Sequence, residues 1–163
     1  MTDYSDSFIN DDLYRQIIID HYNRPHNHCR LPHASHSLEG ENASCGDHIE
    51  LDLLIENGII KDVGFGGEGC SIFTASASIL TDMIKGKTVS EAAELAKAFK
   101  ARLSAHTNPK IAQTAEDIDL GELEALDGVR DYPVRIKCAL LSWETLLQTI
   151  GPEPEEAEDE SEI

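Results

Sequence analysis

The sequence of 163 residues has few basic residues, few aromatic residues and no long apolar run. Its 13 lysines and arginines are outnumbered by 31 acidic residues, which gives a formal net charge of −18. Such a surface repels phosphate backbones and anionic lipid, so we expect neither nucleic-acid nor membrane binding. No stretch reaches the roughly 18 apolar residues of a membrane span, and the polar N-terminus is unlike a signal peptide. We therefore expect a cytoplasmic protein.

The four cysteines, at positions 29, 45, 70 and 138, include no CxxC pair, so their spacing alone does not establish a metal site. Thiols stay reduced in the cytoplasm, which favours metal binding or reactivity over a disulfide framework. Taken singly, however, a free cysteine is more often a buried core residue than a ligand.

Hydrophobic periodicity predicts strands that lie between helices. The expected elements are a helix capped by Asp11 and Asp12 and stopped by Pro25, a loop over residues 26–37, strands over 48–55 and 60–65 with a tight turn at Asn57-Gly58, a helix over 71–86, a helix over 88–103 with a capping box at Thr88 and Glu91, an inserted loop over 104–120, a short helix over 121–126 and a final helix from Pro133. This order predicts an α+β domain with a small antiparallel sheet and helices packed on one face. Its expected span is residues 11–151, between a flexible N-terminus (1–10) and a disordered acidic tail (152–163).

Three places in the chain carry candidate metal ligands. Cys45 and Asp47 flank a glycine before a predicted strand, although an aspartate in that position is also typical of a turn or cap. Cys70 follows a glycine-rich turn and precedes a predicted helix, whose terminal amides can stabilise a thiolate. Cys138 lies one turn inside the final helix. Three thiolates and one carboxylate would complete a tetrahedral shell for zinc.

Several short motifs together form the pattern of a known family. They are LYRQ (13–16), DHY (20–22), NASCGD (42–47), GEGCS (67–71), ASAS (75–78), IKGK (84–87), LDGV (126–129), RIKCA (135–139) and LSW (141–143). On these motifs the chain resembles the SufU family of iron–sulfur cluster assembly proteins, relatives of the IscU scaffolds and of the NifU N-terminal domain. The resemblance implies a SufE/NifU-like fold and a zinc site formed by Cys45, Asp47, Cys70 and Cys138.

Two features favour the SufU branch over the IscU-like scaffolds. Lys137 stands where the scaffolds have histidine, and an insertion, roughly residues 101–120, precedes the final helix. The resemblance then implies a zinc-dependent sulfurtransferase that acts as a carrier and is weakly active alone. It also implies a pyridoxal-phosphate cysteine desulfurase of the SufS kind as partner, whose histidine can replace Cys45 on zinc and free that thiolate to accept persulfide sulfur. Suf scaffold proteins would act downstream.

Two other functions stay open at this point. The same ligands could hold iron or an iron–sulfur cluster, which would make the protein a scaffold, although Lys137 argues against this. Alternatively, the chain could be a structural zinc module whose metal supplies folding energy and whose surface binds partners.

Several further residues are secondary candidates. Arg135 and Lys137 could offset the negative charge of the zinc shell, or could belong to a solvated basic face, and His48 could support the neighbouring Asp47. Cys29 and the histidines from His26 to His36 could form a second metal site, but an exposed spare thiol is the better interpretation. His21 is expected to be structural or part of a partner surface.

Overall fold

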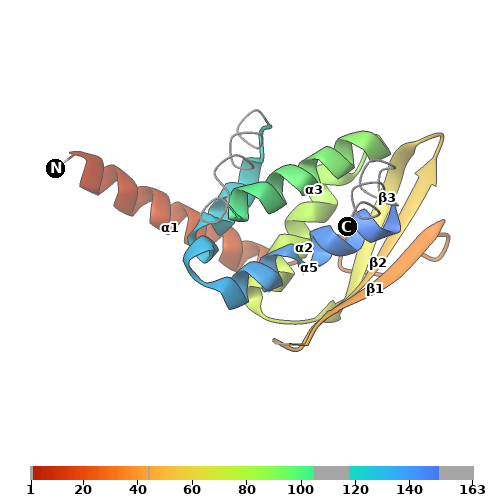
Figure 1. Ribbon diagram of the computed structural model, residues 1–163, viewed down its shortest axis with the longest axis horizontal. Coiled ribbons are helices and arrows are strands. Elements are labelled where there is room, and N and C mark those ends of the chain that lie inside the picture. Colours follow the sequence, from red (N-terminus) through yellow and green to blue (C-terminus); the bar gives the residue numbers. More distant parts are fainter. Residues whose placement is uncertain (1, 44, 105–117, 151–163) are drawn as a thin grey trace, which may run out of the picture.

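A computed structural model describes residues 2–43, 45–104 and 118–150, with side chains from residue 12 onward. Three antiparallel strands in the order β1-β2-β3 form one sheet, and helices cover one of its faces (Figure 1). The elements are α1 (Thr2–Asn23), β1 (His36–Asn42), β2 (Asp47–Glu56), β3 (Ile59–Glu68), α2 (Ser71–Ile84), α3 (Val89–Leu103), the 3-10 helix η1 (Gly121–Asp131) and α5 (Pro133–Thr149). The predicted α+β class is confirmed. Among the described residues, no helix has the length and apolarity to cross a bilayer.

The core lies between the sheet and helices α2, α3 and α5. Alternate side chains of β2, those of Ile49, Leu51 and Leu53, are fully buried on the helix-covered face. Helix α5 packs on β1 and β2, and α2 packs on β3. The buried indole of Trp143 in α5 donates a hydrogen bond from Nε1 to Ser76 Oγ in α2, at 3.1 Å. The two helices are thereby fixed to each other beneath the sheet.

Turn and capping residues form the local structures that the sequence predicts. Asn57 and Gly58 join β2 to β3 with φ values of 55° and 77°, which these two residues tolerate well. The Glu91 amide donates to Thr88 Oγ1 at 3.0 Å, and the Thr88 amide donates to Glu91 Oε1 at 2.9 Å. This capping box begins α3. Pro133 begins α5, and the helix after the glycine-rich turn begins at Ser71, both as expected.

Three element boundaries differ from the prediction. Helix α1 begins at Thr2, not at a cap formed by Asp11 and Asp12, and no Gly or Pro lies between these positions to stop it. Strand β1 begins at His36, near the end of the predicted loop, and continues past it to Asn42. Its polar sequence has no apolar alternation that would indicate a strand, and its backbone pairing with β2 defines it as an edge strand. The short helix predicted over 121–126 is a 3-10 helix that continues to Asp131.

Two predictions fall largely or wholly outside the described residues. The inserted loop coincides largely with residues 105–117, and the acidic tail with residues 151–163. The limits of the domain at residues 11 and 151 stay predictions.

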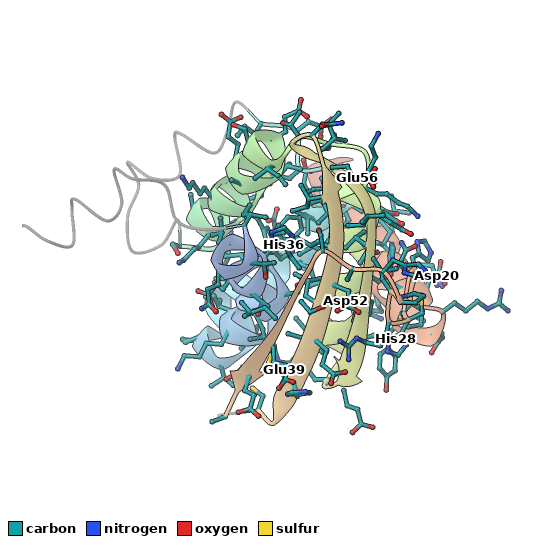
Figure 2. The ribbon with its side chains drawn as sticks, turned by 90° about the vertical axis from the view of Figure 1, so that its right-hand side faces the viewer. Asp20, His28, His36, Glu39, Asp52 and Glu56 are labelled. Carbon is teal, nitrogen blue, oxygen red and sulfur yellow. The ribbon has the colours of Figure 1, made fainter. Side chains whose placement is uncertain are left out.

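The segment after α1 is anchored to the outer face of the sheet, which Figure 2 views directly with Asp52 labelled. Asp52 is 1% exposed because Arg30 covers it, with Nε donating to Oδ2 at 2.7 Å and Nη2 to Oδ1 at 3.1 Å. Ser37 Oγ and the Leu31 amide donate to the same carboxylate at 2.6 and 3.0 Å. Burial raises the pKa of Asp52, but these hydrogen bonds and the charge of Arg30 together lower it below the ordinary value.

Candidate metal centre

Three junctions of the fold bring the predicted ligands together. Cys45 lies in the connection from β1 to β2, Asp47 begins β2, Cys70 is the N-cap of α2, and Cys138 lies in the second turn of α5. The sulfurs of Cys45 and Cys138 are 3.0 Å apart, and ligand atoms of Cys45, Asp47 and Cys138 all lie within 4.8 Å of one another. Cys70 lines the same pocket, of about 240 Å³, as Cys45 and Cys138. Cys45, Asp47 and Cys138 therefore form one group of potential metal ligands, and Cys70 lies beside that group across the shared pocket.

Asn42 holds the Cys45 turn against α5. Its carbonyl accepts hydrogen bonds from the amides of Cys45 and Gly46, at 3.2 and 2.8 Å. Its buried side chain also approaches Cys138, with Nδ2 at 3.8 Å from Sγ. The sequence interpretation gave Asn42 no role of its own. The available hint was its place at the start of the motif that contains Cys45.

Cys70 and Asp47 are linked through the backbone. The Cys70 amide donates to Asp47 Oδ1 at 3.0 Å, and the Phe73 amide donates to Cys70 Sγ at 3.4 Å, which caps α2. Gly69 permits this approach, because a Cβ atom there would lie 2.5 Å from Asp47 Oδ1. The glycine-rich turn before Cys70 thus gives the carboxylate access to the cysteine backbone.

The electrostatics of the pocket suit a cation. Asp47 is 1% exposed, and its Oδ2 has no hydrogen-bond partner among the described residues. Burial, followed by the neighbouring Cys45, Asp47 and Cys70 side chains, raises the pKa of Cys138 far above the ordinary value. A divalent cation would supply the positive charge that lets these thiols ionise together, and would also give Asp47 Oδ2 a partner. Three sulfurs and one carboxylate fit the donor set of zinc.

The secondary candidates Arg135, Lys137 and His48 lie in different surroundings, and only Arg135 lines this pocket. Arg135 lines it, with its guanidinium carbon 5.7 Å from the centroid of the Tyr132 ring. Lys137 lines a different pocket, beside Leu103 and Ile136. His48 reaches across the sheet, where its Nδ1 lies 3.6 Å from Glu41 Oε1. Arg135 is therefore the better placed of the two cations to offset charge at the thiols.

Within the described ranges, the histidine-rich segment does not form the second metal site of Cys29 and histidines that the sequence analysis considered. Cys29 is exposed, and it belongs to none of the potential metal-binding groups that the described residues form. His26 instead lies beside His21 and Asp82. His21, expected to be structural or part of a partner surface, is 4% exposed.

The fold and the thiol cluster define a class: small α+β domains in which separate junctions present cysteines to one metal-sized volume. The family model of the NifU-like N-terminal domain matches residues 13–139, and the chain belongs to this family. The resemblance to SufU proteins that the motifs indicated is confirmed by the relatives.

The zinc-dependent sulfurtransferase SufU of Bacillus subtilis (strain 168) is 42% identical over 143 residues, which cover 88% of this chain and 92% of that relative. The iron–sulfur cluster assembly scaffold protein IscU of Streptococcus pyogenes serotype M1 is 40% identical over 138 residues, which cover 85% and 82%. The crystal structure of FiSufU from the thermophile Fervidobacterium islandicum AW-1 superposes with a TM-score of 0.71 at 33% identity, covering 83% of this chain and 94% of that one.

Proposed function

We propose that this protein is a zinc-dependent sulfur carrier of iron–sulfur cluster assembly, which accepts persulfide sulfur on Cys45 from a pyridoxal-phosphate cysteine desulfurase. The observation that carries the proposal is the grouping of the Cys45 and Cys138 thiols with a buried carboxylate whose Oδ2 has no partner among the described residues, beside a third thiol, that of Cys70. The similarity to a zinc-dependent sulfurtransferase over most of both chains supports it.

Cys45, Asp47, Cys70 and Cys138 are the residues that would hold zinc. When bound, zinc keeps thiolates deprotonated at neutral pH and shields them from oxidation. A carboxylate is a harder zinc ligand than a thiolate, so Asp47 would make the site more exchangeable than one of four cysteines.

The accessible thiols differ in how firmly they are held, and this favours Cys45 as the acceptor. Cys138 is 2% exposed, which excludes it from contact with a partner's cysteine. Cys70 is exposed, but its sulfur caps α2 by accepting the Phe73 amide. Cys45 is half-buried and lies in a strand connection, not at a helix cap; its sulfur is 3.0 Å from Cys138 Sγ and 3.9 Å from the Val134 carbonyl oxygen. Displacement of the Cys45 sulfur therefore leaves the cap of α2 intact.

The transfer is a thiolate–persulfide exchange. The Cys45 thiolate attacks the terminal sulfur of the desulfurase persulfide and forms a new sulfur–sulfur bond. The bond to the desulfurase cysteine breaks, and its electron pair leaves on that cysteine as a thiolate. No external oxidant or reductant is needed, and the persulfide on Cys45 is then available to a Suf scaffold protein.

The surface around Cys45 suits a partner protein. Tyr132 and Val134, at the start of α5, are 59% and 56% exposed, and Val134 lines the thiol pocket. Exposed aromatic and aliphatic side chains are common anchors in protein interfaces. We infer that the desulfurase contacts this rim when it delivers sulfur.

The second candidate function is an iron–sulfur cluster scaffold that uses the same four ligands, which the 40% identical IscU relative supports. Lys137 weighs against it, because a protonated ammonium has no lone pair with which to bind iron. Purification separates the two functions. A colourless protein with one tightly bound zinc supports the carrier, and a brown cluster that transfers to an acceptor supports the scaffold.

Cys45→Ala tests the carrier function directly. We expect the variant to lose stimulation of the desulfurase and to show no added sulfur by mass spectrometry after incubation with desulfurase and cysteine. Cys29→Ala is the matched control, because this exposed thiol lies outside the metal-binding groups, and it should behave as the unmodified protein. Full stimulation by Cys45→Ala would refute the acceptor role.

A further inference from the structure

A second group of metal-ligating side chains lies toward the opposite end of α2 from Cys70. His21 comes from the end of α1, His26 from the segment after it, and Asp82 from the last turn of α2. One ligand atom from each of the three lies within 4.8 Å of the others. Glu122 of η1 adjoins the group, with Oε1 at 2.9 Å from His21 Nε2. We propose that His21, His26 and Asp82 form a second metal site, for a borderline divalent ion such as zinc or cobalt, with Glu122 at its margin.

His21 is oriented as a metal-binding histidine should be. Its ring is buried, and Nδ1 lies 2.7 Å from Ser78 Oγ in α2. Nε2 lies 2.9 Å from Glu122 Oε1, to which it donates its hydrogen when no ion is bound. If Nδ1–H donates to the Ser78 hydroxyl instead, Nε2 has a free lone pair that a cation could bind beside this carboxylate. A ligating histidine usually donates its second ring N–H in this way, which fixes both tautomer and ring orientation.

His26 is held in place by its own backbone. Its amide donates to Ser78 Oγ at 2.7 Å, and Thr81 Oγ1 donates to its carbonyl at 3.3 Å. Asn27 Nδ2 donates in turn to Thr81 Oγ1 at 3.0 Å. These bonds fix the segment on α2, with the His26 Nδ1 atom against Asp82 Oδ2. Two of the three ligands are thus positioned by the same serine.

The chemistry and access of the group suit a transition metal. Two imidazoles with a carboxylate match zinc, cobalt or nickel better than calcium or magnesium, which prefer oxygen ligands alone. The His26 and Asp82 side chains are 51% and 40% exposed, so an ion can enter from solvent. A pocket of about 520 Å³, lined by Asp20, Asn23, Arg24 and His26, adjoins the group. The strongly negative net charge of the chain favours a cation.

This inference does not depend on the sulfur-carrier function, and cobalt distinguishes the two sites. Cobalt bound by thiolates shows strong sulfur-to-metal charge-transfer bands, whereas cobalt bound by imidazole and carboxylate does not. We expect zinc-loaded protein to bind one equivalent of Co2+ with weak d–d bands, no thiolate band and full retention of its zinc. Binding should weaken at least about 10-fold in His26→Ala and in Asp82→Asn.

The controls separate this site from its neighbours. His36→Ala removes an exposed histidine from the start of β1, and Cys29→Ser removes the exposed thiol, so both variants should bind cobalt as the unmodified protein does. His26 and Asp82 are both substantially exposed, so their replacement should leave the thermal unfolding curve of the zinc-loaded protein almost unchanged. No bound cobalt, unchanged affinity in His26→Ala and Asp82→Asn, or a thiolate band that Cys29→Ser abolishes would each overturn the proposal.

Discussion

Replacing Asp47 with alanine should have small effects on the metal-free protein and large effects on the zinc-loaded protein. In the metal-free form the change removes the hydrogen bond from the Cys70 amide, a loss of about 1.5–3 kcal/mol for a charged acceptor. It also removes the unpartnered, buried Oδ2, whose desolvation costs about 1–3 kcal/mol. The two contributions oppose each other, so the free energy of unfolding should change by about 1 kcal/mol or less.

The zinc-loaded form of Asp47→Ala should lose more stability than the metal-free form. Changes to residues that merely support metal ligands weaken metal affinity about 10–100-fold, and loss of a ligand should cost at least as much. At about 1.4 kcal/mol per factor of ten, this lowers the zinc-linked stability by at least about 1.4–2.8 kcal/mol.

Urea unfolding at buffered free zinc, and again with chelator, measures the change in the free energy of unfolding for the zinc-loaded and the metal-free forms. Asp52→Ala is the matched control, because Asp52 is equally buried but is fully hydrogen-bonded on the outer face of the sheet (Figure 2). Its loss of stability should be the same with and without zinc. If Asp47→Ala also lost the same free energy in both forms, its carboxylate would be a structural cap of the Cys70 backbone and not a metal ligand.

Two further predictions concern the sheet. Asp52→Asn should cost about 1–2 kcal/mol at neutral pH, since Arg30 is half exposed and partly screened. Because the folded pKa of Asp52 lies below its unfolded value, the difference from the unmodified protein should persist above about pH 4 and shrink as the pH falls further; urea unfolding that shows a constant difference would contradict this. Gly40→Ala places a Cβ 2.2 Å from Thr145 Oγ1 and should cost about 1–3 kcal/mol. Thr145→Ala in the same chain should restore part of that loss, and strictly additive effects in thermal unfolding would exclude the steric cause.

Local backbone chemistry accounts for the parts of the fold that the sequence predicts well. The Asn57-Gly58 turn and the Thr88 capping box depend on residues next to one another, so their signals are contained in a few positions. Strand β1 depends on its neighbour: its residues pair with β2 across the hairpin, and nothing in their own polarity shows it. The predicted start of α1 was wrong because a local signal was misleading. Asp11 and Asp12 are good helix caps, but aspartate is also tolerated inside a helix.

The two potential metal-binding groups show the same limit at longer range. Cys45 and Cys138 are separated by 93 positions, and only the family motifs, not the spacing, indicated that their sulfurs would meet. The histidine-rich segment drew attention to Cys29 as a partner for His26. Asp82, 56 positions away from His26, is the partner in the structure, because Ser78 and Thr81 of α2 bind the backbone of that segment. Short-range composition could identify candidate ligands but not which element would face them.

Helix α2 connects the thiol group to the histidine group. Two of its buried serines, Ser76 and Ser78, each form hydrogen bonds beside one of the two groups. Ser76 donates to the Ala139 carbonyl at 2.6 Å, next to Cys138, whereas Ser78 binds His21 and the His26 backbone. At 1.5 Å per residue, Cys70 and Asp82 are about 18 Å apart along the helix. That distance exceeds the Debye length of about 8–10 Å, so ions at the two ends should influence each other little through solvent. A change in zinc affinity at the thiols on filling the histidine site would therefore indicate coupling through the protein, for which α2 is the element that the two groups share.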